Sequence, residues 1–162
     1  MRFGKGTPGV PWGMIAAIVM VGSGAMAVGI TGCGTTEPAE PVPLGAIVQG
    51  ISWVATDYSA ERTDDGGILI TGSSPIEIEI TLELVADTVG VYPVGTGLSS
   101  ALLIDEGARY TPRGVTAGSV TVTSIEGERI TGYFGFTAKL EGNAGVLRDV
   151  TNGEFSLPLS SE

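Results

Sequence analysis

The chain has no histidine and only one cysteine, Cys33, among its 162 residues. Without imidazole it lacks the usual general base, any Ser-His or Cys-His pair and most zinc sites. A lone cysteine has no partner for a disulfide within the monomer. Lys and Arg are also few, 8 against 18 Asp and Glu, so the formal net charge is −10. Such an acidic chain repels phosphate backbones, and nucleic-acid binding is not expected.

Residues 1–33 have the order of a bacterial lipoprotein signal. Arg2 and Lys5 precede an apolar run over residues 10–30, and small residues lead up to Cys33. In this processing, a lipid is transferred to the Cys33 thiol and the signal is then cut before that residue. The sequence therefore predicts a membrane-attached protein whose attachment comes from the lipid.

Two other interpretations of this segment remain, an uncleaved anchor and ordinary secretion. The apolar run is close to the roughly 20 residues that span a bilayer. Pro11 and five glycines make it a poor permanent helix, which favours cleavage. Gly34 follows the cysteine where an aspartate would resemble an inner-membrane retention signal. We therefore expect a cell-envelope location at the outer membrane, facing either the periplasm or the outside.

The predicted organisation has three parts. Residues 1–32 form the signal peptide, residues 33–43 the lipidated cysteine with a flexible tether, and residues 44–162 the folded domain. The tether holds three prolines and too little apolar surface to repay its ordering. Removing Arg2 and Lys5 with the signal takes two positive charges from a net −10, which leaves −12. The remaining chain is long enough for one domain with its own core.

From Ile47 onward the hydrophobic pattern alternates with period two. The clearest strand is Ile76–Leu84, with five aliphatics on one face and three glutamates and a threonine on the other. A second strand over residues 129–139 places its phenylalanines on one face. Gly132 and Gly135 interrupt it, which predicts a bulge or a close backbone approach.

The remaining segments predict further strands separated by turns. The candidates are Val48–Tyr58, Ile68–Gly72, Gly90–Val94, Ala101–Asp105, Ser119–Ile125 and two pieces within Val146–Leu159. Turn signals include Gly142-Asn143 and Asn152-Gly153, and Glu126-Gly127 is typical of a tight hairpin. No segment of the domain has helical periodicity. About eight strands predict an all-β domain, either a single antiparallel β-sandwich or a small, partly open β-barrel.

Five of these segments together resemble a family of small bacterial lipoproteins that carry a β domain of unknown function. They are Gly50–Ala55, Gly90–Gly95, Gly118–Thr123, Arg129–Ala138 and Val150–Pro158. Their order and spacing extend over most of residues 46–159. The resemblance implies a compact β domain on a lipid anchor, and it brings no activity and no site residues.

Carboxylates dominate the remaining chemistry. Asp64 and Asp65, followed by two glycines, are weak candidates for a calcium site, although the spaced aspartates of a calcium loop are missing. The competing interpretation is a solvated hairpin loop. Glu77, Glu79 and Glu83 form an acidic stripe that could attract cations or a basic partner. The water-facing side of an antiparallel sheet also produces such a stripe.

The aromatic residues divide into two groups. Four of them lie on apolar faces and are expected in the core, namely Trp53, Phe134, Phe136 and Phe155. Tyr110 and Tyr133 are the candidates for exposed contact residues, Tyr110 in a loop before Pro112 and Tyr133 among polar strand neighbours. Exposed rings of this kind would suit a sugar-binding platform.

Three functions remain open, and none needs a metal or cofactor. The first is a non-enzymatic envelope module with a binding or structural role, whose partner would be another envelope protein or a glycan. The second is a ligand-carrying or inhibitor-like β-barrel, whose exposed apolar loop would be Leu98–Ile104. The third is a glycan hydrolase with two facing carboxylates. An apolar internal cavity would favour the carrier, and two acids across a cleft would favour the hydrolase.

Overall fold

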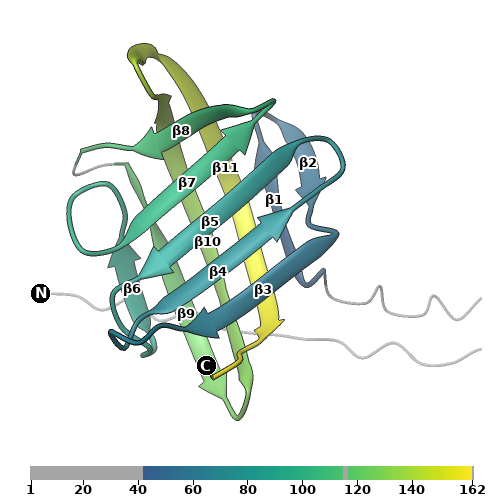
Figure 1. Ribbon diagram of the computed structural model, residues 1–162, viewed down its shortest axis with the longest axis vertical. Helices are drawn as coiled ribbons and strands as arrows, with labels where there is room; N and C mark the ends of the chain where they lie inside the picture. The colour runs from purple at the N-terminus through teal and green to yellow at the C-terminus, as the bar shows by residue number, and fades with distance from the viewer. Residues whose placement is uncertain (1–41, 115–116, 162) are drawn as a thin grey trace, which may run out of the picture. The chain divides into compact units, whose positions relative to one another are not determined.

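The computed structural model describes residues 42–114 and 117–161, so the signal, Cys33 and most of the tether lie outside the described residues. Eleven β-strands make up this part of the chain, and it contains no helix long and apolar enough to cross a membrane. The strands are β1 (Leu44–Val48), β2 (Ile51–Val54), β3 (Asp57–Arg62), β4 (Ile68–Ser73), β5 (Ile78–Leu84), β6 (Gly90–Pro93), β7 (Ser100–Asp105), β8 (Ala108–Pro112), β9 (Gly118–Glu126), β10 (Arg129–Leu140) and β11 (Asn143–Pro158) (Figure 1).

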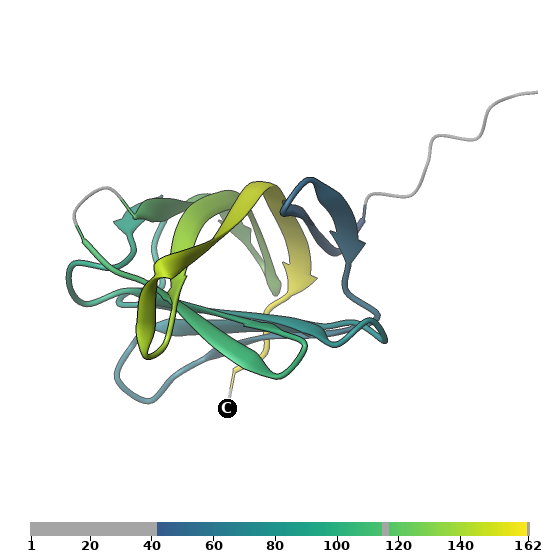
Figure 2. The same cartoon turned by 90° about the horizontal axis from the view of Figure 1, so that it is seen from above.

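All eleven strands belong to one curled antiparallel sheet, which forms a half-barrel. Its main order is β2-β1-β11-β10-β8-β7-β5-β4-β3, while β9 pairs with β10 and β6 with β9. Strand β10 forks the sheet, because its first part pairs with β9 and its last three residues pair with β8. We call β6, β9, β10, β11, β1 and β2 the long-strand layer, and β3, β4, β5, β7 and β8 the short-strand layer (Figure 2). The all-β prediction is confirmed.

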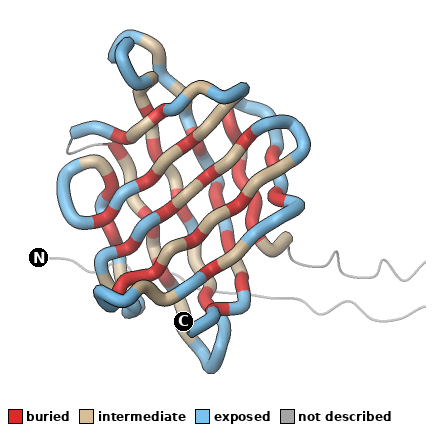
Figure 3. Tube along the Cα trace, in the orientation of Figure 1, coloured by how far each residue is buried: buried red, intermediate tan, exposed pale blue. Residues whose placement is uncertain are grey.

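The core lies between the two layers. Alternate residues of each strand point inward, which produces the bands of buried positions in Figure 3. Trp53 is 1% exposed and donates its indole N–H to Ser74 Oγ at 2.9 Å, which ties β2 to the end of β4. All four aromatics expected in the core are buried, as are the inward aliphatics of β4 and β5. Gly72 allows this approach, since a Cβ there would lie 2.3 Å from Leu44 Cδ2.

The predicted strand Ile76–Leu84 begins two residues later than expected. A tight turn at Ser74–Glu77 precedes it, in which the Ser74 amide donates to the Ile78 carbonyl at 3.0 Å. Glu77 has a φ of 59°, and Ile76 is 57% exposed. The expectation for Ile76 was therefore wrong, and only Glu79 and Glu83 of the acidic stripe lie on the strand.

Two missed hairpin turns help to explain why eleven strands are found instead of about eight. The segment Val48–Tyr58 is not one strand, because Gln49 and Gly50 both have positive φ and close the β1–β2 hairpin. Glu106 and Gly107 close the β7–β8 hairpin in the same way. In both pairs the two residues have the positive φ angles that are typical of an Asn-Gly turn. The first residue is Gln or Glu, however, and these residue types seldom adopt a positive φ.

In β11 a turn was predicted where the strand in fact continues. Asn152-Gly153 was expected to be a turn between two pieces, but both residues lie inside one 16-residue strand. Asn152 has a φ of 49°, and the register of β11 against β1 and β10 shifts at this point. The pair is therefore a bulge that bends β11. The predicted β9–β10 hairpin is confirmed, but its two loop residues are Gly127 and Glu128, because Glu126 pairs with Arg129 as the last residue of β9. The irregular pairing near Gly132 and Gly135 is also confirmed.

Candidate functional site

Tyr133 lies on the outer face of the long-strand layer. Since Phe134 points into the core, alternation turns Tyr133 outward, and its side chain is 56% exposed. The strand register places it in a row across six strands. From one edge to the other this row reads Val91, Thr121, Tyr133, Glu154, Gly45 and Val54. The exposure expected for Tyr133 is confirmed.

Hydroxyl groups surround this ring. We define the Tyr133 face as Thr121, Thr123, Thr131, Tyr133, Glu154 and Ser156. The Thr123 hydroxyl donates to the Thr131 carbonyl at 3.2 Å, and Arg129 donates from Nη1 to Ser156 Oγ at 3.1 Å. Hydroxyls both donate and accept, so the face offers both halves of a hydrogen bond beside one aromatic ring. This combination suits a neutral, hydroxyl-rich ligand.

Tyr110 was the second candidate for exposure, and that prediction was wrong. It is 4% exposed and pairs with Leu103 of β7 in the β7–β8 hairpin. Arg148 covers its ring, with the guanidinium carbon 5.1 Å from the ring centroid, and also donates to Asp105 at 2.8 Å. That hydrogen bond raises the pKa of Arg148. The segment before Pro112 is a strand, so Tyr110 alternates into the core.

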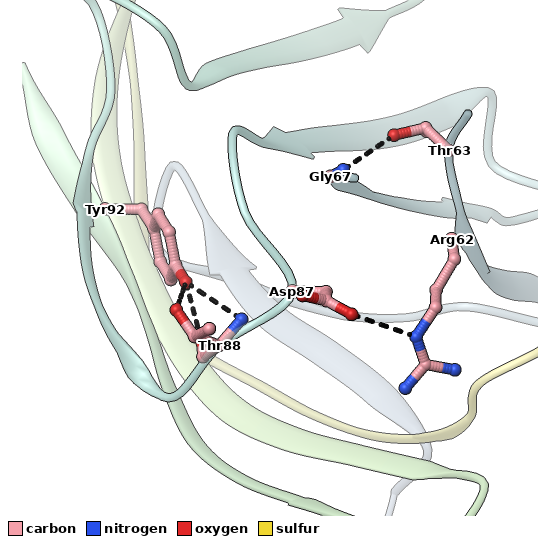
Figure 4. A network of polar contacts seen from close by, with 6 residues as sticks. All are labelled: Arg62, Thr63, Gly67, Asp87, Thr88 and Tyr92. Carbon is pink, nitrogen blue, oxygen red and sulfur yellow. Dashed lines mark hydrogen bonds and ion pairs between the residues drawn. The ribbon is translucent and has the colours of Figure 1, made fainter. Parts of the chain in front are cut away.

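Asp64 and Asp65 lie in the β3–β4 hairpin loop. The Thr63 hydroxyl accepts a hydrogen bond from the Gly67 amide at 3.0 Å (Figure 4). The same hydroxyl donates to the Asp65 carboxylate. The Thr63 hydrogen bond lowers the pKa of Asp65, although partial desolvation opposes this effect. Among the described residues, no three His, Cys, Asp or Glu side chains come together as metal ligands. These contacts support a hydrogen-bonded loop.

The interior of the half-barrel is filled by side chains. The Phe134 ring lies 6.4 Å from both the Phe136 and Phe155 ring centroids, and Trp53 packs in the same core. Five depressions lined by described residues have volumes of about 310–470 Å³, and all five open to solvent. This packing does not resemble the internal chamber that a carrier of small ligands would need.

The loop proposed for the carrier is also shorter than expected. Leu98 is 80% exposed, but Ala101 and Leu103 are buried in β7. A neighbouring loop is held to the fold by polar contacts. Tyr92 exchanges hydrogen bonds with Thr88, and Arg62 contacts Asp87 at 3.2 Å (Figure 4). The apolar segment Leu98–Ile104 is therefore mainly part of the sheet.

A second exposed ring, which the sequence pattern did not predict, belongs to Tyr58 on β3, and this residue is 42% exposed. Two depressions share Tyr58 and Ser59 in their linings, one at the edge of β3 and one over β3 and β4. Tyr58 lies on the same inward face as the buried Ala60, but its strand is the last in the sheet, so the ring stays exposed. No period-two pattern reports which strand lies at an edge.

The fold defines a half-barrel β domain with a buried apolar core. The family model for a domain of unknown function, DUF6252, matches residues 43–157, and the chain belongs to this family. A search of curated proteins found no match, and neither did a search of solved structures. The family agrees with the expected β domain of unknown function.

Proposed function

We propose that this protein is a lipid-anchored, non-enzymatic module of the bacterial cell envelope that binds a glycan through the Tyr133 face. The observation that carries the binding role is the 56% exposed ring at the middle of a six-strand row, bordered by hydroxyls. An aromatic ring offers a flat apolar surface to the C–H face of a sugar. Hydroxyl groups at its border can pair with sugar hydroxyls.

Several features favour binding over catalysis. The chain has no histidine, and its only cysteine is the lipid acceptor in this proposal. Glu79 and Glu83 lie four residues apart on one strand and do not face each other across a cleft. Thr63 lowers the pKa of Asp65, whereas a general acid needs a raised value. We expect no hydrolysis of peptide, ester or glycan substrates, and turnover lost on replacing one carboxylate would contradict this.

The anchor is tested by Cys33→Ser. The variant should lose labelling by radioactive palmitate and move from the membrane fraction to the soluble fraction. A variant with Thr35→Ser, two residues away, is the matched control and should label normally. Unchanged labelling of Cys33→Ser would contradict lipid attachment at that residue.

The binding face is tested with the full-length protein in detergent and insoluble peptidoglycan as the probe. Tyr133→Ala should reduce the bound fraction by about threefold to tenfold, which is the range expected for one lost ring contact. Tyr58→Ala removes another exposed tyrosine, on a different surface, and should leave the bound fraction unchanged. Equal losses in both variants, or no retention of the parent protein, would overturn the glycan proposal.

A further inference from the structure

The edge of β3 is only partly covered. The C-terminal segment runs parallel to the second half of β3, where the Ser160 amide donates to the Ala60 carbonyl and the Arg62 amide donates to the Ser160 carbonyl, each at 3.0 Å. Backbone groups of Ala60 and Arg62 therefore point away from β4. Because residues two apart on a strand point the same way, the N–H and C=O of Tyr58 also face this edge.

A depression of about 470 Å³ lies beside Tyr58. The first half of β3 forms one wall, while Pro158 and the segment after it form the opposite wall and Glu128 of the β9–β10 hairpin contributes a carboxylate. Pro158 has no N–H and cannot donate to β3 as Ser160 does. The edge of β3 is therefore covered at Ala60–Arg62 and open beside Tyr58, where the depression forms a slot.

The charges around this slot have one sign. The depression over β3 and β4, of about 450 Å³, is lined by Asp57 and Glu79, and neither depression has a Lys or Arg in its lining. Arg62, at the far end of β3, contacts Asp87 at 3.2 Å. The two depressions beside Tyr58 thus hold three carboxylates, and no Lys or Arg in their linings neutralises these charges.

We propose that this slot, the Tyr58 edge, binds an extended cationic peptide segment of a partner protein as an added strand. A residue opposite Tyr58 would close two main-chain hydrogen bonds, which is how strand addition provides affinity. Successive side chains of the added strand point to opposite faces. Two adjacent basic residues would therefore place one side chain near Asp57 and Glu79 and the other near Glu128. The exposed Tyr58 ring adds a surface on which a cation can rest.

The site is distinct from the Tyr133 face in place and in chemistry. Exposed edge strands are normally blocked because they pair with other chains. Here the C-terminal segment blocks β3 at Ala60–Arg62 only. A slot of limited length admits a short segment and not a whole sheet edge, which gives the interaction a defined register.

The test uses the full-length protein in detergent and a capped, fluorescent peptide of sequence TVKRVT. Binding measured by fluorescence polarisation should weaken as salt is raised, because exposed charge pairs are screened. Hydrogen exchange followed by mass spectrometry should slow in residues 57–60 on binding. A peptide with N-methyl groups at its two central residues keeps the charge and should lose this binding, since it cannot pair as a strand.

Two triple variants that remove the same number of negative charges distinguish binding at the Tyr58 edge from attraction of the peptide to the net charge of the protein. Asp57→Asn, Glu79→Gln and Glu128→Gln together should weaken peptide binding by about tenfold, as three exposed pairs are lost. Glu83→Gln, Glu106→Gln and Glu141→Gln remove the same charge elsewhere and should change binding less than about twofold. Tyr58→Ala should weaken binding, whereas Tyr133→Ala should not.

Equal weakening by the two triple variants would overturn the proposal, because it would show attraction to net charge alone. Unchanged affinity of the N-methylated peptide would overturn strand addition. Absence of binding to the parent protein would overturn the site as a whole. None of these results bears on glycan retention by the Tyr133 face.

Discussion

On the outer face of the short-strand layer, Glu61, Glu79 and Glu83 extend from β3 and β5 among threonines and half-buried aliphatics. On the outer face of the long-strand layer, Tyr133 stands among hydroxyls with Glu154 beside it. Both faces follow the same alternation and enclose the same core. The difference teaches that alternation decides which side chains meet water, whereas the polar residue types decide what kind of ligand each face suits.

Both layers enclose one core, so they should unfold together. Trp53→Ala should have the largest effect on this shared core. The change removes a fully buried indole and its hydrogen bond to Ser74, so we expect a loss of about 3–5 kcal/mol in the free energy of unfolding. Tyr133→Ala is the matched exposed control and should cost less than about 1 kcal/mol. Urea denaturation of both variants provides the measurement, and similar costs would contradict the assigned core.

A methyl group added to one glycine in each layer should give a smaller effect. At Gly132 of the long-strand layer a Cβ would lie 2.2 Å from the Thr121 carbonyl oxygen, which is backbone. At Gly72 of the short-strand layer it would lie 2.3 Å from a Leu44 methyl, which can move. Both Gly→Ala changes should destabilise by about 1–3 kcal/mol, with Gly132→Ala the larger.

The control for both changes is Gly97→Ala, where a Cβ meets nothing within 4 Å. Its thermal midpoint should stay close to that of the parent protein. If Gly72→Ala costs more than Gly132→Ala, the Leu44 side chain does not move aside, which would contradict the expected ranking.

Ion pairs between and within the layers should contribute less again. Arg148 of β11 reaches Asp105 of β7 at 2.8 Å and lies over the Tyr110 ring, so it joins the two layers. Arg148→Ala should cost about 1 kcal/mol, because stem packing is lost with the charge. Arg62→Ala breaks a more exposed contact with Asp87 and should cost less than about 0.5 kcal/mol. Thermal unfolding at low and high salt checks this, and a larger cost for Arg62→Ala would contradict it.

The smallest effect concerns the acidic hairpin loop. Thr63→Ala should raise the pKa of Asp65 toward its usual value, because the main lowering hydrogen bond is lost. The folded pKa lies below the unfolded pKa, so Asp65 contributes stability above its unfolded pKa and loses it as the pH falls through the folded pKa. NMR titration of the Asp65 carboxyl carbon provides the measurement. Ser59→Ala should leave this titration unchanged, and an unchanged Asp65 pKa in Thr63→Ala would contradict the assigned cause.

The inward faces of the strands could be predicted because burial of apolar side chains imposes period two on the sequence. This held for β10, where Phe134 and Phe136 are buried and Tyr133 is exposed. The prediction was wrong at Ile76, because this residue lies in a tight turn although the apolar and polar residues alternate without a break. It failed again at Tyr110, because the Glu106-Gly107 turn creates a hairpin that the residue types do not announce.

The sequence by itself determined the all-β class, the buried aromatic core, the hairpin between β9 and β10 and the exposure of Tyr133. These depend on local alternation and turn chemistry, which neighbouring residues specify. Only the tertiary structure decided that β10 forks the sheet, that Arg148 covers Tyr110 and that β3 ends it with Tyr58 at an open edge. Strand order depends on contacts between residues far apart in the chain, and the alternation within one strand is the same whether that strand lies at the centre of a sheet or at its edge.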